Sequence, residues 1–216
     1  MTMALNRRIL ILPATIILLF LGIPNFCYSS SLLQNIEQDV LQNVRSVLMD
    51  SSGHEFSIRW EYSFEGDYWS GDGTLQILGH DYLRLILPYQ EILIQKSVIM
   101  TRFQETDQVI IDYFDRHNTS NFFSLLLGEF AGYSIIELDS NPDFTVNLRL
   151  LNETLVGFEE LEMSINQNTW LPLFITAKAG EDIKVTIKII ETRELLNVDD
   201  LKNTTLRGGE IIDLRE

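Results

Sequence analysis

The chain is poor in the residues that carry most catalytic and metal-binding chemistry, with one cysteine and three histidines among 216 residues. The histidines, His54, His80 and His117, fall in or beside predicted turns, and none has a partner at a metal-ligand spacing such as H-x-x-x-H. The sequence contains no G-x-S-x-G elbow, P-loop, dinucleotide-binding glycine pattern or C-x-x-C. We therefore expect no catalytic residue, no metal site and no cofactor, in a protein that is not an enzyme.

Basic residues are also scarce. Lysine and arginine together number 16 against 31 acidic residues, which gives a formal net charge of −15. A chain of this charge repels the phosphate backbone, so nucleic acid is not an expected partner. The same charge discourages adsorption to anionic membrane surfaces and favours a soluble monomer.

A long apolar run occurs only near the N-terminus. Two arginines precede an apolar stretch from Ile9 to Ile23, and small residues follow at Cys27 and Ser29. This is the order of a secretory signal peptide. We predict a signal peptide at residues 1–29, cleaved after Ser29, and a mature protein in the periplasm.

Cleavage there would leave a single domain, residues 30–216, without the only cysteine of the chain. Such a domain forms no internal disulfide and depends on packing for its stability. Two alternatives stay open, an uncleaved membrane anchor and a lipoprotein acylated on Cys27. The apolar run is shorter than the roughly 20 residues of a spanning helix, and Pro13 and Gly22 interrupt it.

The first segment of the mature chain has helical periodicity. Ser30 and Ser31 can cap a helix, and Asp50 to Gly53 supplies turn residues that end it. Apolar residues three and four positions apart form one stripe along this helix, which must therefore lie on an apolar surface. The stripe consists of Leu33, Ile36, Val40, Leu41, Val44, Val47 and Leu48.

Alternating apolar and polar residues predict a sheet with one apolar face. From Phe56 to Phe64 every second residue is large and apolar, and successive side chains of a strand point to opposite faces. Turn residues such as those at 71–73 separate the strands closely, which indicates hairpins and antiparallel pairing. Further strands are expected near 74–79, 82–87, 91–95, 98–104, 107–114, 133–138, 144–151, 158–166, 171–178 and 183–191.

A second helix is expected from Thr119 or Ser120 to about Phe130. It is apolar on nearly every side, with Phe122, Phe123 and Leu126 among its residues, so it should be buried on more than one side. The predicted fold is mainly β with helices. It is a strongly curved antiparallel sheet or incomplete β-barrel of about 11 strands, with two helices covering the concave face.

The order of these elements resembles the LolA-type carriers of bacterial lipoproteins over nearly the whole mature chain. The resemblance rests on the signal peptide, the first helix and the runs that follow. These are Gly73-Thr74-Leu75-Gln76-Ile77, Asp81-Tyr82-Leu83-Arg84-Leu85, Val109-Ile110-Ile111-Asp112-Tyr113, the helix from Phe122 to Phe130, and Asn168-Thr169-Trp170-Leu171-Pro172.

The resemblance implies an incomplete antiparallel barrel whose helices act as a lid over an apolar cavity. It also implies an inner-membrane release complex and an outer-membrane acceptor as partners. An arginine of the family holds the lid closed, and its position matches Arg84. Arg59, which precedes Trp60, is the alternative for this role.

We predict a periplasmic chaperone that binds the acyl chains of lipoproteins or lipids and carries them toward the outer membrane. The alternative is a lipid-sensing or protein-binding envelope domain of the same fold, whose interior is ordinary packed core. The expected lid residues are Val40, Val44, Phe122, Phe123 and Leu126, and the expected cavity residues are Trp60, Tyr62, Phe64, Leu148 and Met163.

Overall fold

The computed structural model describes residues 30–117, 121–140, 142–151, 157–196 and 198–215. The predicted signal peptide, residues 1–29, lies outside the described residues. The chain divides into two units, Met1–Asn35 and Ile36–Glu216, and every contact discussed below lies within the second. In the described part of the chain, no helix combines the length and the apolarity that crossing a membrane requires.

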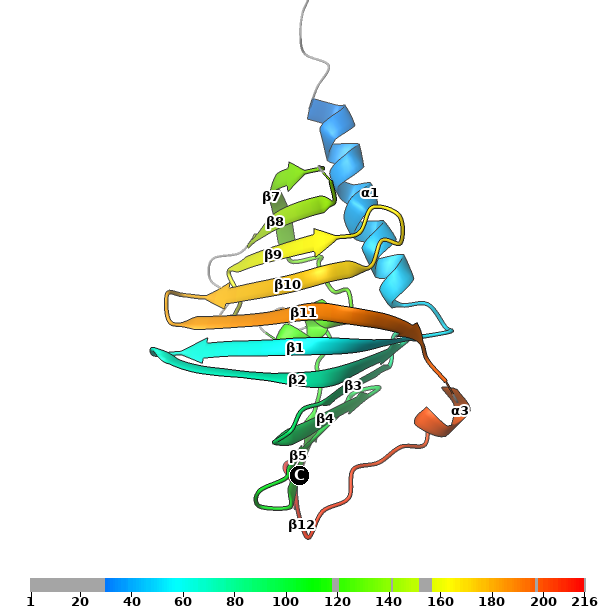
Figure 1. Ribbon diagram of the computed structural model, residues 1–216, viewed down its shortest axis with the longest axis vertical. Helices are drawn as coiled ribbons and strands as arrows, with labels where there is room; N and C mark the ends of the chain where they lie inside the picture. Colours follow the sequence, from blue (N-terminus) through cyan, green and yellow to red (C-terminus); the bar gives the residue numbers. More distant parts are fainter. Residues whose placement is uncertain (1–29, 118–120, 141, 152–156, 197, 216) are drawn as a thin grey trace, which may run out of the picture. The chain divides into compact units, whose positions relative to one another are not determined.

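One sheet dominates the second unit and confirms the predicted fold class (Figure 1). Its strand order is β12-β6-β5-β4-β3-β2-β1-β11-β10-β9-β8-β7, so the described residues form twelve strands where about eleven were predicted. Neighbouring strands are antiparallel except for β12, which pairs with β6 in parallel. The strands are β1 (His54–Phe64), β2 (Asp67–Leu78), β3 (Tyr82–Ile86), β4 (Gln90–Gln95), β5 (Val98–Phe103), β6 (Gln108–Tyr113), β7 (Tyr133–Asp139), β8 (Phe144–Leu150), β9 (Glu160–Ile165), β10 (Pro172–Ala179), β11 (Ile183–Glu194) and β12 (Glu210–Asp213).

The alternating segment at the start of the domain forms the central strand. β1 pairs with β2 on one side and with β11 on the other, which joins the two halves of the sheet. Phe56, Ile58 and Trp60 are buried on the inner face, as the alternation predicts. The inner face is the face that carries the main hydrophobic core.

β2 begins earlier than predicted, because Gly71 to Gly73 continue the strand instead of forming a turn. The reason is steric at Gly73. A Cβ at that position would lie 2.5 Å from the carbonyl oxygen of Ile86 and 2.7 Å from Cδ2 of Leu87. Glycine in a strand interior often marks such a close approach rather than a turn.

Two helices contribute to the main core. α1 (Ser30–Leu48) has the predicted bounds, and its residues Val40, Val44 and Leu48 are buried in the same cluster as the inner face of the sheet. α2 (Phe122–Leu126) contributes Phe122, Leu125 and Leu126 to that cluster. We call α1 from Ile36 onward, together with α2, the cover.

α2 is shorter than predicted. The Asn121 side chain caps its first turn, and the predicted start at residue 119 or 120 lies outside the described residues. The helix ends at Leu126, before the predicted end at Phe130, and Gly128 follows it at a φ of +72°. A Cβ at Gly128 would lie 3.0 Å from Cγ of Arg45, so glycine also permits close contact with α1.

The outer face of the sheet carries a second apolar cluster, which corrects the prediction of a single apolar face. Apolar residues of β3 to β6 meet the C-terminal segment, which contains α3 (Val198–Leu201) and β12. Neither of these two elements was predicted. The buried members of this outer cluster are Leu78, Tyr82, Leu93, Met100, Val109, Leu195 and Leu206.

Candidate functional site

The cover and the inner face meet in a continuous apolar contact. The Trp60 ring on β1 lies edge-on to the Phe122 ring of α2, with 5.6 Å between the ring centroids. Phe122 also contacts Phe123 and Phe158 through edge-type ring contacts. Leu126, one turn further along α2, is fully buried in the same cluster.

The five predicted cavity residues do not share one environment. Trp60, Leu148 and Met163 are buried together in the main core beneath the cover. Tyr62 is half-buried at the margin of this core and stacks on Trp69 at 5.5 Å between centroids. Phe64, at the end of β1, is 37% exposed and lies outside the core cluster.

The interior between cover and sheet is nearly filled. One cavity between them has a volume of about 10 Å³ and is lined by Leu48 of α1, Leu126 of α2 and apolar residues of the sheet such as Phe56 and Ile187. A space of this size holds about one water molecule at most. This cavity is therefore too small for a ligand with a long hydrocarbon chain.

A buried carboxylate joins the two helices of the cover. Glu129, just after α2, has a side chain only 9% exposed, and its Oε1 accepts hydrogen bonds from Nε of Arg116 at 2.5 Å and Nη2 of Arg45 in α1 at 3.4 Å. His117 Nδ1 lies 3.9 Å from Oε2 of the same carboxylate. We call Glu129, Arg45 and Arg116 the Glu129 cluster.

Arg116 extends this cluster to the turn between β2 and β3. Its guanidinium donates to the carbonyl oxygen of Leu127 at 3.2 Å, to the carbonyl oxygen of His80, and to Nδ1 of the His80 ring at 3.1 Å. The cluster therefore connects α1, the segment after α2 and the sheet at one end of the cover. Sequence reasoning missed it, although a single acid within the apolar run from Leu125 to Phe130 was the available signal.

The arginines expected to hold the lid have other partners. Arg84 lies on the outer face of β3, and its Nε donates to Oε1 of Glu91 on β4 at 2.6 Å. Arg59 on β1 pairs with Asp72 on β2 at 2.9 Å, and both side chains are exposed. Among the described residues, neither arginine has a hydrogen bond to α1 or α2.

A groove of about 720 Å³ opens beside the Glu129 cluster. It runs between α1, lined by Leu41 and Arg45, and the segment after α2, lined by Phe130 and Tyr133. The Tyr133 hydroxyl donates to the carbonyl oxygen of Phe158 at 2.7 Å, and burial raises the pKa of this phenol to about 12. The groove is an open margin of the cover next to its ionic contacts.

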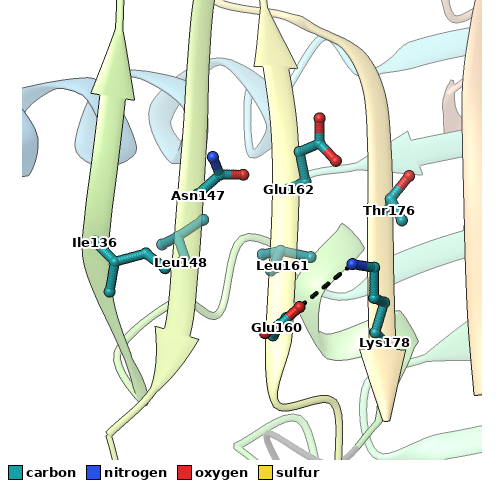
Figure 2. A pocket seen from close by; sticks show the side chains of 8 residues that line it. All are labelled: Ile136, Asn147, Leu148, Glu160, Leu161, Glu162, Thr176 and Lys178. Atoms are coloured by element: carbon teal, nitrogen blue, oxygen red, sulfur yellow. Dashed lines mark hydrogen bonds and ion pairs between the residues drawn. The ribbon is translucent and has the colours of Figure 1, made fainter. Parts of the chain in front are cut away.

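The outer face of β7 to β10 carries a small pocket of about 110 Å³, lined by polar residues such as Asn147 and Glu162 and by Ile136 (Figure 2). Nζ of Lys178 lies 3.3 Å from Oε2 of Glu160 across this face. Leu148 belongs instead to the main core on the inner face. The described residues contain no group of three or more histidine, cysteine, aspartate or glutamate side chains that could hold a metal ion.

Comparisons with known proteins identify a shared fold. No family model matches the chain, and no curated protein matches its sequence. An uncharacterized conserved protein from Thermus thermophilus superposes with a TM-score of 0.54 at 13% identity, over 82% of this chain and 98% of that chain. The two proteins have the same fold.

LolA superfamily proteins are among the structural neighbours. One from Nitrosomonas europaea has a TM-score of 0.43 at 8% identity, over 78% of this chain and 97% of its own. A putative outer membrane lipoprotein-sorting protein domain from Vibrio parahaemolyticus has a TM-score of 0.45 at 8% identity, over 78% and 99% of the two chains. Both are similar to this chain at low sequence identity.

Proposed function

We propose that the chain is a periplasmic carrier that shelters acyl chains of lipoproteins or lipids and catalyses no reaction. The observation that carries this proposal is the apolar inner face, which α1 and the short α2 cover together with apolar residues before and after α2, such as Phe114 and Phe130. Moving an acyl chain from a bilayer into water costs about 0.8 kcal/mol per CH₂ group. A carrier must therefore offer an apolar surface that water does not reach.

Loading requires the cover to open. The Glu129 cluster lies at one end of the cover and the groove between α1 and Tyr133 lies beside it. Breaking polar contacts at this end would expose the inner face without disrupting the strand pairing of the sheet. An acyl chain that contacts Trp60 and Phe122 would then replace the lost contacts between the cover and the sheet.

Delivery gives the carrier two further partners under this proposal. An inner-membrane release complex would supply the acylated protein, and an outer-membrane acceptor would receive it. The contact between cover and sheet favours return to the closed form. Side chains of the cover therefore compete with the acyl chain for the inner face. This competition permits release of the cargo.

Binding of an acylated peptide tests the proposal. A triacylated lipopeptide is titrated against the mature chain, with the same peptide lacking acyl chains as control, and heat release or displacement of an apolar dye is measured. We expect saturable binding of the lipopeptide alone. Binding of the unacylated peptide with equal affinity, or of neither peptide, would contradict the carrier.

The nearly filled interior favours a second candidate, an envelope domain that binds a protein partner and carries no lipid. The cavity of about 10 Å³ is the observation behind it. Lipid extracts of the chain isolated from a periplasmic fraction separate the two candidates by mass spectrometry. A carrier retains acylated species, whereas the protein-binding domain retains none.

A further inference from the structure

A second pocket lies on the outer face of the sheet, and His80 lines both this pocket and the groove beside the cover. Its volume is about 850 Å³, and it lies between β3, β5 and β6 and the segment that follows α3. Apolar side chains of the outer cluster and its margin form its floor. They are Leu78, Tyr82, Val98, Met100 and Ile111. We call this space the outer pocket.

The C-terminal segment is fixed over the sheet without filling this space. The side-chain amide of Gln95 donates to the carbonyl oxygens of Leu201 at 3.1 Å and Lys202 at 3.4 Å. The Thr205 hydroxyl lies 3.9 Å from the sulfur of Met100. Leu206 is buried against the same sheet face. The outer pocket is therefore preformed, and its volume is in the range of small-molecule sites, about 300–1,000 Å³.

The charge of this pocket is opposite to that of the chain. Lys96, Lys202 and Arg215 line it together with His80, and Asp81 is the one acid in its lining. In a chain with 31 acidic and 16 basic residues, such a lining is unusual. It attracts an anion to a place that is otherwise apolar.

The lysines are the groups available to a ligand. Lys96 has no carboxylate partner among the described residues, and Lys202 reaches only Asp199, at 3.7 Å. Arg215 is engaged by Asp213 through two hydrogen bonds, at 2.6 and 2.8 Å. Lysine ammonium groups act as point charges that attract an anionic head group, and a carboxylate is the anionic group usually found at the end of a hydrocarbon chain without further polar groups.

We infer that the outer pocket binds a free long-chain carboxylic acid, with the hydrocarbon chain on the apolar floor and the carboxylate between Lys96 and Lys202. The floor accounts for the chain and the two lysines account for the head group. The site is separate from the inner face. It would bind its ligand with the cover closed.

Titration of laurate and of 1-dodecanol by calorimetry tests this inference, because the two ligands share a chain and differ in charge. Lys96→Glu is compared with Lys184→Glu, which makes the same charge change at an exposed lysine of β11 without a carboxylate partner among the described residues. We expect Lys96→Glu to weaken laurate binding about fivefold or more and to leave dodecanol unchanged. Lys184→Glu should affect neither ligand.

Two results would overturn the inference. One is laurate affinity that Lys96→Glu and Lys184→Glu change equally. The other is equal affinity of the native chain for laurate and dodecanol. Both lysines are exposed, so neither substitution should prevent folding, and a thermal unfolding curve of each variant checks this.

Discussion

Glu129→Gln lowers the free energy of unfolding by roughly 3 kcal/mol, the size expected when a buried ion pair loses one partner. The substitution preserves the shape of the side chain and removes its charge. Arg116, whose side chain is 17% exposed, then loses the one carboxylate that pairs with its guanidinium in the described part of the chain. Urea unfolding followed by circular dichroism measures the change.

Glu160→Gln is the matched control for this prediction. Glu160 also has two basic neighbours, Lys178 at 3.3 Å and Arg149 at 3.9 Å, but its side chain is 50% exposed. An exposed pair contributes about 0–1 kcal/mol, so this variant should unfold almost as the native chain does. Equal destabilisation by the two substitutions would show that the Glu129 cluster does not depend on its burial.

The position of the Glu129 cluster predicts a second consequence. Because Arg45 belongs to α1 and Glu129 follows α2, loss of the carboxylate weakens the contact between the helices of the cover. Glu129→Gln should therefore increase the binding of an apolar dye under native conditions, whereas Glu160→Gln should not. If the variant is fully folded and its dye binding is unchanged, the Glu129 cluster does not control opening of the cover.

Val44→Asp has the other large expected effect. The Val44 side chain of α1 is fully buried in the main core. An isolated carboxylate there loses its hydration without gaining a partner. We expect α1 to lose its contact with the inner face and the midpoint of thermal unfolding to fall by more than 10 °C. For a chain of this size, a loss of about 1 kcal/mol in the free energy of unfolding lowers the midpoint by roughly 2–4 °C. Scanning calorimetry measures the midpoint.

Gln42→Asp provides the comparison, because Gln42 is exposed on the same helix. It adds the same charge without burying it, so the midpoint should change by only a few degrees. If Val44→Asp unfolds like Gln42→Asp, α1 does not cover the core. Limited proteolysis adds a second measure, since a detached α1 is cleaved before the sheet is.

The sequence predicted the elements with strong periodicity. The stripe from Val40 to Leu48 and the alternation from Phe56 to Phe64 each became the expected helix or strand, because burial on one face requires that spacing. The antiparallel sheet followed from the close spacing of turns. The general position of the cover followed from the apolar character of the segment around Phe122.

Other features depend on contacts between distant segments. Gly73 looks like a turn residue, but it lies within β2, where the absence of a side chain lets the backbone of Ile86 in β3 approach closely. β12 is short and pairs in parallel with β6, and no local sequence pattern predicts this pairing. Glu129 and Arg45 are 84 residues apart in sequence, so their ion pair could not be recognised from spacing.

Phe64 shows the limit of reasoning from alternation alone. It continues the apolar rhythm of β1, yet the strand extends past the core and leaves this ring 37% exposed. Alternation fixes which face a side chain joins. It does not fix where along the strand the covering elements end.

The central claim, that acyl chains bind between the cover and the inner face, is tested most directly through Trp60. Trp69→Phe and Trp170→Phe leave Trp60, which contacts Phe122, as the sole tryptophan. Its fluorescence is then recorded during titration with a lipopeptide whose acyl chains carry bromine, a contact quencher. We predict saturable quenching that the unbrominated lipopeptide does not cause. Binding of the lipopeptide without quenching of Trp60 would contradict the account.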